Sequence, residues 1–457
     1  MLSRISIIGG GLAGSLLAVY LAKRGMKIDI YERRGDIRRY NLVGGKSINL
    51  ALSARGIHAL KEIGIYDEIR KITIPMYGRM IHSLDGATQL LPYGKDNSQY
   101  INSVSRAELN KKLISYAESF HNVRFHFNMI CSGIDLKNRY IFFGEHPDGT
   151  GTEYDIAIAT DGATSQVRME FQKIPGFNFS QEYENYGYKE LTIPPDEYGK
   201  HKMEPNALHI WPRGSFMLIA LPNLDGSFTC TLFLANHKSF GGENSFEELD
   251  NESKLKNFFL KNFPDAVPLM PGFAEEFFAN PLGTLLTIKC YPWSAYGHTL
   301  LLGDSAHAIV PFFGQGMNAA FEDCTVLNEC IGKYEYNWEV IFNEFQKIRK
   351  PNTDAIAELA RENFVEMRDR VADPRFHLMK KIETYLYMKY PDRFVPKYTM
   401  VTFLRIPYSV ALERGNIQEK ILLQLSESVT SPDEIDMNLA DELVNEKLTV
   451  LDYSLEP

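Results

Sequence analysis

The sequence predicts an α/β protein with an α+β division into two lobes, followed by a helical C-terminal region. Three observations predict this class. The chain opens on a short apolar strand, a glycine-rich turn, a helix and a second strand, which is the βαβ pattern of a parallel sheet. Residues 181–285 instead mix aromatic strands with Pro and Gly turns, as an antiparallel sheet does. From about residue 335 onward the pattern is mostly helical and polar.

Composition indicates an ordinary globular protein. The 457 residues suffice for two or three domains, and 44% of them are hydrophobic. The formal net charge of −9 argues against a nucleic-acid-binding surface. The five cysteines form no C-x-x-C pair, an apolar strand begins close to Met1, and no run of about 18 apolar residues occurs. We therefore expect reduced thiols and a cytoplasmic protein without a signal peptide or a membrane span.

The N-terminal βαβ unit carries a dinucleotide-binding fingerprint. The strand Ile5–Ile8 leads into G-x-G-x-x-G at Gly9, Gly11 and Gly14, and a helix follows. The absence of side chains lets a pyrophosphate approach the N–H groups at the helix N-terminus. Glu32 ends the second strand about 20 residues further on, where its carboxylate can accept hydrogen bonds from both ribose hydroxyls. An acid at this place favours FAD or NAD over NADP.

The elements after this unit suggest that the first domain is discontinuous. SARGIHALKEIG has apolar residues at helical spacing, and Ser105 with Glu108 fits a capping box at the start of another helix. VRFHF, RYIFFG and EYDIAIAT are typical of strands, and LLLGDSAHA later returns to the strand-then-loop pattern. The predicted division is a dinucleotide-binding domain of residues 1–75, 101–180 and 286–350, a substrate domain of 76–100 and 181–285, and a C-terminal helical region of 351–457. Residues 427–457 are rich in acids, so we expect a solvated end of low order.

Two local patterns suggest other chemistries, and both fail. Gly45-Lys46-Ser47 is similar to an NTPase phosphate loop, but Tyr40 stands where that loop needs its first glycine. Asp304 and His307 suggest a metal site or a hydrolase dyad, but the chain lacks H-E-x-x-H and G-x-S-x-G. We expect a packing histidine and no metal.

Two further motifs favour a flavin. Asp161–Arg168 matches D-G-x-x-S-x-x-R and Gly303-Asp304 matches a G-D motif, and with the glycine fingerprint they stand in the order found in single-component FAD-dependent aromatic hydroxylases. The chain resembles that family. The resemblance implies a Rossmann-like FAD-binding domain of the aromatic hydroxylase type. Asp304 can bind a ribityl hydroxyl, and residues 314–318 can offer backbone N–H groups to the flavin ring.

Within this family, four stretches are similar to the members that hydroxylate L-kynurenine: GGKSINLALSARG, YGRMIHSLDG, LPYGKDNSQYINSVSR and PFFGQGMNAAFEDC. The resemblance implies that NADPH reduces the bound FAD, that O2 gives a C4a-hydroperoxide, and that 3-hydroxykynurenine forms, a step of tryptophan degradation and NAD biosynthesis. It also implies a monomer or homodimer of the soluble bacterial type, because animal and fungal members end in a membrane-anchoring segment. The alternative is a hydroxylase of another aromatic amino acid or of a phenol. The intact Asp304 and GQGMN disfavour a flavoprotein without turnover, and the lack of W-x-W-x-I-P disfavours a flavin halogenase.

The resemblance also assigns site residues. Arg79 can pair with the substrate α-carboxylate and Tyr93 can donate to the same group, while Phe312 can contribute an apolar wall. The substrate-binding residues we expect are Arg79, Tyr93, Asn363, Tyr398, Met367 and Phe312. The FAD-binding residues we expect are Gly9, Gly11, Leu12, Ala13, Gly14, Glu32, Arg33, Ala51, Arg106, Ile130, Asp161, Asp304, Gly316, Met317 and Asn318. Ser53 is expected near the cofactor, with Arg55 available to a phosphate or to NADPH.

Overall fold

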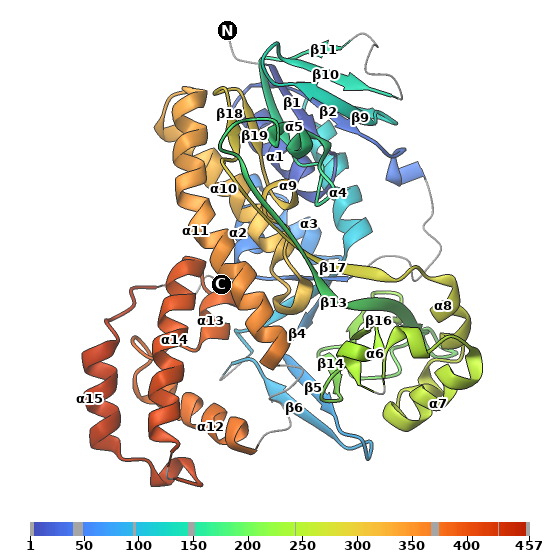
Figure 1. The fold of residues 1–457 in the computed structure, drawn as a ribbon, viewed down its shortest axis with the longest axis vertical. Helices are drawn as coiled ribbons and strands as arrows, with labels where there is room; N and C mark the ends of the chain where they lie inside the picture. The colour runs from blue at the N-terminus through green and yellow to red at the C-terminus, as the bar shows by residue number, and fades with distance from the viewer. Residues whose placement is uncertain are drawn as a thin grey trace.

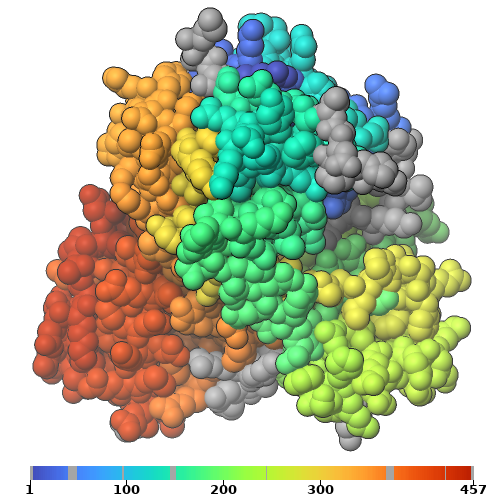
Figure 2. All heavy atoms as spheres, turned by 45° about the horizontal axis from the view of Figure 1, so that its top comes forward, coloured from blue at the N-terminus to red at the C-terminus, as the bar shows by residue number. Residues whose placement is uncertain are grey.

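A computed structural model describes residues 4–39, 49–94, 97–144, 151–242, 244–366, 374–427 and 429–453. Two large sheets and a cluster of C-terminal helices make up the molecule (Figure 1). Figure 2 shows the C-terminal helices, in red, on one side and the segment of α7 (Glu252–Asn262), in yellow-green, on the other. The predicted α/β class with a helical C-terminal region is confirmed.

The first large sheet joins strands from distant parts of the chain. In spatial order they are β18 (Ser294–Ala295), β19 (Thr299–Leu301), β12 (Ile156–Ala159), β1 (Arg4–Ile8), β2 (Lys27–Glu32) and β8 (Val123–Phe127). All neighbours run parallel except β18 and β19. Because parallel strands end at one edge of a sheet, the segments that follow β1, β2, β12 and β19 meet there.

Helices enclose this sheet. α1 (Leu12–Lys23) joins β1 to β2 and packs against α4 (Arg106–Glu118) and α10 (Gly316–Lys333). Ser105 accepts a hydrogen bond from the N–H of Glu108 at 3.4 Å, so the helix start predicted there is confirmed. The smaller elements around them are η1 (Ile37–Arg39), β3 (Asn49–Leu52), α2 (Ala54–Ile63), α3 (Tyr66–Arg70), β4 (Thr73–Met76), β7 (Ile101–Ser105), β9 (Cys131–Asp135), β10 (Tyr140–Phe143), β11 (Thr152–Glu153), α5 (Gln166–Phe171), α9 (Asp304–His307) and η4 (Pro311–Phe313).

The second large sheet has seven strands. In spatial order they are β17 (Gly283–Tyr291), β13 (Asn178–Ile193), β16 (Phe228–Ala235), β15 (Met217–Pro222), β14 (Leu208–Pro212), β5 (Gly78–His82) and β6 (Thr88–Pro92). It is antiparallel as expected, except that β5 lies parallel to β14. The boundaries expected at residues 180 and 285 fall inside β13 and β17, because both strands continue towards the first sheet (Figure 1). The segment with α6 (Lys238–Gly241), η2 (Phe246–Glu248), α7, η3 (Val267–Leu269) and α8 (Phe273–Ala279) contributes to the apolar core of this sheet.

The C-terminal region consists of helices. They are α11 (Trp338–Val365), α12 (Pro374–Lys389), α13 (Lys397–Thr402), α14 (Tyr408–Leu425), η6 (Pro432–Glu434) and α15 (Met437–Lys447). The expected solvated end of low order is wrong for α15. Asp436 caps this helix, and Leu443 and Val444 are buried in one apolar cluster with Ile421 and Leu422 of α14. Apolar residues at helical spacing in MNLADELVNEK carry this signal, which the abundance of acids obscured.

Within the described ranges, no helix is long and apolar enough to span a bilayer. The five cysteines, Cys131, Cys230, Cys290, Cys324 and Cys330, are all free and buried.

A buried pair of histidines lies between β5 and β14. His209 Nε2 donates to the carbonyl of Glu204 at 2.8 Å, and its Nδ1 lies 2.8 Å from His82 Nε2. His82 Nδ1 in turn lies 2.8 Å from Asp265 Oδ2. Burial lowers the pKa of His209 from 6.5 to about 4. The neutral imidazole is therefore the form that the fold requires.

This pair makes stability depend on pH. The unfolded chain protonates His209 near pH 6.5 and the folded one only near pH 4, so its contribution is complete above pH 6.5 and is lost as the pH falls through this window. Between pH 7 and pH 4, protonation of His209 is expected to lower the unfolding free energy of the wild type by about 3 kcal/mol. The His209→Leu variant is expected to lack this part of the decrease. Urea unfolding of the FAD-loaded protein at several pH values measures this, with His121→Gln, at an exposed position, as the control. Parallel pH curves for wild type and His209→Leu would contradict the role of His209.

Candidate active site

The glycine-rich turn between β1 and α1 uses its glycines in two ways. Gly9 has a φ of +106°, and a Cβ there would lie 2.4 Å from the carbonyl oxygen of Thr160. A Cβ on Gly14 would lie 2.0 Å from the carbonyl oxygen of Gly9. Gly11 differs, because a Cβ there would meet no heavy atom of the described residues within 4 Å. Gly9 and Gly14 thus permit backbone packing, while Gly11 leaves open space at the N-terminus of α1, with Leu12 and Ala13 half-buried behind it.

The end of β2 lies beside this turn. Glu32 accepts hydrogen bonds from the N–H of Gly10 at 2.8 Å and from that of Arg34 at 3.0 Å. The carbonyl of Glu32 accepts from the N–H of Met129, which places the neighbouring Ile130 at the same edge with 58% of its surface exposed. Arg33 is exposed here as well. The structure therefore gathers Glu32, Arg33 and Ile130 at one place.

The two aspartates of the flavin motifs have different surroundings. Asp161 Oδ2 accepts from the N–H of Gln166 at 2.8 Å, and its Oδ1 accepts from the hydroxyl of Ser305 at 2.8 Å. Asp161 thus joins the two motif loops to each other. Asp304 is exposed, and the described residues offer its carboxylate no hydrogen bond. A Cβ on the preceding Gly303 would lie 3.7 Å from the Cβ of Ala13, so Asp304 stands next to the start of α1.

The turn before α10 lies against β3. Asn318 Oδ1 accepts from the N–H of Ser53 at 3.0 Å, and its Nδ2 donates to the carbonyl oxygens of Ala51 at 2.8 Å and Gly314 at 3.0 Å. No side chain caps the first turn of α10, where Gly316 and Met317 are half-buried. Asn318 therefore fixes the turn, and the first N–H groups of the helix stay available to a ligand.

Arg106 is exposed at the first position of α4. Asn110 of the same helix donates to the carbonyl of Gly10 at 3.4 Å. The start of α4 thus lies near the glycine-rich turn.

The predicted carboxylate-binding residues lie together on the second sheet. The Arg79 guanidinium carbon is 4.6 Å from the ring centroid of Tyr398 and 5.8 Å from that of Tyr93, and the two tyrosine rings stack at 5.4 Å. Arg79 Nε and the Tyr93 hydroxyl are both buried without a hydrogen-bond partner among the described residues. Burial raises the pKa of Tyr93 well above its ordinary value, so its phenol stays protonated and can donate. Two buried donors thus lack an acceptor here.

Aromatic rings extend this cluster towards the flavin motifs. Phe313 stacks on Tyr398 with 5.4 Å between the centroids, and Phe312 stacks on Phe364 at 3.9 Å. Asn363 Nδ2 donates to the carbonyl of Phe312 at 2.7 Å and is buried. All substrate-binding residues expected from the sequence meet here except Met367, which lies outside the described residues, as do Gly45, Lys46 and Ser47.

One expectation is wrong. Arg55 is only 1% exposed, and it donates to Glu322 and to three backbone carbonyls, so it is not available to a phosphate or to NADPH. His307 is a buried packing residue that lies 2.6 Å from Asp323 Oδ2. No group of three His, Cys, Asp or Glu side chains in the described part of the chain is arranged to hold a metal ion.

Sequence reasoning missed the partners of these two residues. The FEDC stretch at Phe321–Cys324 places two adjacent acids in a helix that is otherwise apolar, and this was the available signal. Arg349 pairs with both acids, at 2.5 Å to Glu322 and 2.7 Å to Asp323. Nothing local in the sequence connects it to them.

Comparisons with known proteins concern the fold and the family of the chain. A family model described as an NAD(P)-binding Rossmann-like domain matches residues 7–72. Among solved structures, 2-methyl-3-hydroxypyridine-5-carboxylic acid oxygenase has a TM-score of 0.66 at 18% identity, over 82% of this chain and 94% of that one. Pseudomonas aeruginosa PqsL, in complex with 2-aminobenzoylacetate, has a TM-score of 0.65 at 16% identity, over 81% of this chain and 98% of that one. At these identities the likeness concerns the fold alone.

Relatives of known name match nearly the whole chain. The kynurenine 3-monooxygenase of Myxococcus xanthus is 47% identical over 449 residues, which cover 97% of this chain and 95% of that protein. That of Flavobacterium johnsoniae is 48% identical over 92% of this chain and 93% of its own, and that of Dictyostelium discoideum is 44% identical over 97% and 98%. The chain therefore belongs to the kynurenine 3-monooxygenase family.

Proposed function

We propose that this protein is a FAD-dependent monooxygenase that converts L-kynurenine to 3-hydroxykynurenine with NADPH and O2. One observation carries the choice of substrate class: within the part of the chain that the structure describes, the buried Arg79 Nε and Tyr93 hydroxyl have no acceptor, and they lie beside a set of aromatic rings. A buried donor without a partner costs about 1 to 3 kcal/mol, which an incoming carboxylate recovers. An aromatic amino acid provides a carboxylate and a ring together.

The residues present fit FAD. The open space at Gly11 accommodates a pyrophosphate at the start of α1, where the N–H groups favour an anion. Glu32 has further lone pairs for a ribose hydroxyl, and the exposed Asp304 carboxylate suits a ribityl hydroxyl. The first turn of α10 offers N–H groups to the flavin ring. When bound, FAD supplies the redox chemistry that activates O2.

The protein's own residues bind and orient the substrate. Arg79 and Tyr93 hold its α-carboxylate, and the rings of Phe312, Phe313 and Tyr398 form an apolar wall for its aromatic ring. This wall excludes water from the reacting atoms. Asn363 holds Phe312 in place through the Phe312 carbonyl. Met367 stays a substrate contact that we propose from the sequence alone.

The proposal also covers the docking of NADPH, the cellular location, the oligomeric state and the domains. A single full dinucleotide fingerprint in the sequence supports transient docking of NADPH without a second Rossmann domain. The free cysteines support a reducing, cytoplasmic location, and we propose a monomer or a homodimer. We also propose that the two large sheets correspond to the FAD-binding and substrate domains.

The test is a turnover assay. The purified yellow protein is mixed with NADPH and O2, with L-kynurenine, L-tryptophan or a simple phenol, and both NADPH consumption and hydroxylated product are measured. We expect L-kynurenine alone to accelerate NADPH consumption and to give 3-hydroxykynurenine. Faster turnover with another aromatic compound, or no hydroxylated product, would contradict the proposal.

A further inference from the structure

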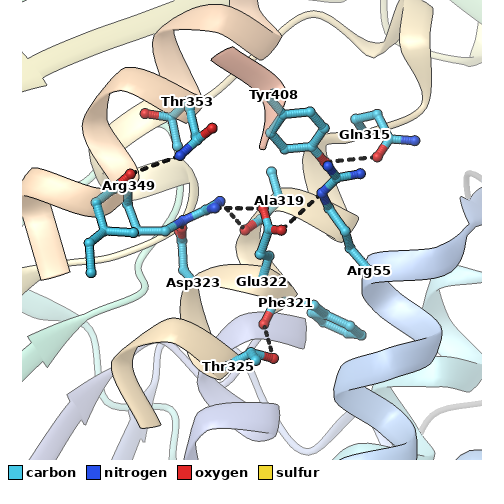
Figure 3. Close-up of polar contacts among 12 residues, drawn as sticks. Arg55, Gln315, Ala319, Phe321, Glu322, Asp323, Thr325, Arg349, Thr353 and Tyr408 are labelled. Atoms are coloured by element: carbon cyan, nitrogen blue, oxygen red, sulfur yellow. Dashed lines mark hydrogen bonds and ion pairs between the residues drawn. The ribbon is translucent and has the colours of Figure 1, made fainter. Parts of the chain in front are cut away.

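A buried network of charges lies between the two proposed binding regions. Arg55 of α2 and Arg349 of α11 approach Glu322 of α10 from opposite sides, and Arg349 also reaches Asp323 (Figure 3). The two guanidinium groups balance the two carboxylates. Burial alone would raise the pKa of Glu322, but Arg349 and Arg55 hold it below its ordinary value, so the carboxylate stays ionised.

Arg55 also holds a turn of the C-terminal region. Its Nη1 donates to the carbonyls of Val401 and, at 2.9 Å, Leu404, and its Nη2 donates to the carbonyl of Ile406. A guanidinium can make these bonds together with the one to Glu322, because its five N–H groups have fixed directions. These carbonyls belong to the end of α13 and the turn after it, and α13 carries Tyr398.

Arg55 also contacts Tyr408, which binds the loop before α10, where we propose that the flavin ring lies. The Arg55 guanidinium carbon lies 3.8 Å from the centroid of the Tyr408 ring. The hydroxyl of Tyr408 donates to Gln315 Oε1 at 2.9 Å, as Figure 3 also shows. Gln315 Nε2 donates to the hydroxyl of Ser53 at 3.2 Å. Arg55 therefore touches both the turn after α13, which supports Tyr398, and Tyr408, whose hydroxyl binds Gln315 in the loop before α10.

Stability alone is a poor explanation for this arrangement. Buried ion pairs often stabilise a fold no more than apolar residues of the same volume, because the charges lose their hydration. The network instead fixes the position of the turn that follows α13. Of the four hydrogen bonds that Arg55 donates, three go to backbone carbonyls at the end of α13 and in the turn after it.

We propose that Arg55 is a positioning residue, which sets the place of Tyr398 in the substrate site and joins it to the loop before α10. This inference rests on the proposed function, since Tyr398 lines the proposed substrate site. Loss of Arg55 would free the turn, widen the site and admit water. The substrate would then bind more weakly, and more NADPH would be consumed without hydroxylation.

The test compares two charge-balanced double variants of the FAD-loaded protein. Arg55→Met with Glu322→Gln removes the bonds to the turn, while Arg349→Met with the same Glu322→Gln removes a buried arginine that does not touch the turn and leaves Asp323, which accepts from the N–H of Gly303, unchanged. We expect the first to raise the KM for L-kynurenine about tenfold and to lower the yield of product per NADPH. We expect the second to keep this KM within about twofold.

Amide hydrogen exchange of residues 397–406 is the second readout, and it does not depend on turnover. We expect faster exchange in the first variant than in the second, because the turn loses its donors. Should the first variant fail to fold, Arg55→Lys, with one point charge and fewer usable donors, replaces it, and its KM should rise less. An equal rise in KM in both variants, or unchanged exchange of 397–406, overturns the role of Arg55. A wild type without kynurenine turnover refutes the proposed function instead, and the exchange result still decides the role of Arg55.

Discussion

Replacing Arg79 by alanine is expected to raise the KM for L-kynurenine tenfold to a hundredfold while FAD stays bound. Among the described residues Arg79 Nε has no hydrogen-bond partner although it is buried, and Tyr398 and Tyr93 flank the guanidinium. A charge-assisted hydrogen bond to a buried carboxylate contributes about 1.5 to 3 kcal/mol, which corresponds to this change in KM. Steady-state kinetics, together with the flavin absorbance of the purified variant, measures both parts of the expectation.

The matched control is Arg361→Ala. This arginine lies exposed on α11, where it faces Glu182 and Glu184 of β13, so its removal changes the net charge equally without touching the site. We expect its KM to stay at the wild-type value. Loss of flavin from the Arg79 variant, or the same KM in both variants, would refute the assignment of Arg79 to the substrate carboxylate.

The second large effect concerns two glycines of the same turn. Gly11→Ala is expected to weaken FAD binding by at least about tenfold while the cofactor-free protein keeps its stability, because the methyl group enters space that we assign to the pyrophosphate. Gly14→Ala is expected to destabilise the cofactor-free protein itself. Its Cβ would lie 2.0 Å from a carbonyl oxygen of the turn, and backbone atoms must move to relieve that contact.

Two measurements separate these glycines. Thermal unfolding of the cofactor-free proteins reports stability, and titration with FAD reports affinity. Wild-type affinity in the Gly11 variant would place the pyrophosphate elsewhere. Equal loss of stability in both variants would show that Gly11, like Gly14, serves packing.

The sequence predicts well those features that depend on neighbours in the chain. The glycine spacing, the position of Glu32 at the end of β2 and the capping by Ser105 each follow from a few consecutive residues, and each appears in the structure. The grouping of Arg79, Tyr93 and Tyr398 came from a resemblance. Periodicity alone does not bring residues of β5 and α13 together.

The sequence-based predictions were wrong about which charged residues are buried and which helices they cover. Arg55 follows a strand beside the expected cofactor, so a role towards a phosphate was the simplest interpretation, yet its partners are Glu322 and carbonyls between residues 401 and 406. Those partners depend on how the C-terminal helices pack, which no local pattern encodes. The acids of α15 misled for a similar reason, since they cover one face of a helix whose other face is buried.

The strand order of the first sheet has a consequence for biosynthesis. Ile7 in β1 pairs with Ile158 in β12, and Ile158 pairs with Leu300 in β19, so strands emerging late from the ribosome complete a sheet begun by the earliest ones. At about 5 to 20 residues per second, the roughly 140 residues between β12 and β19 take about 7 to 30 s to synthesise. During that time β12 has an unpaired edge, which other chains can join. The nascent protein is therefore exposed to aggregation until β19 emerges, and chaperone supply during translation should limit its yield.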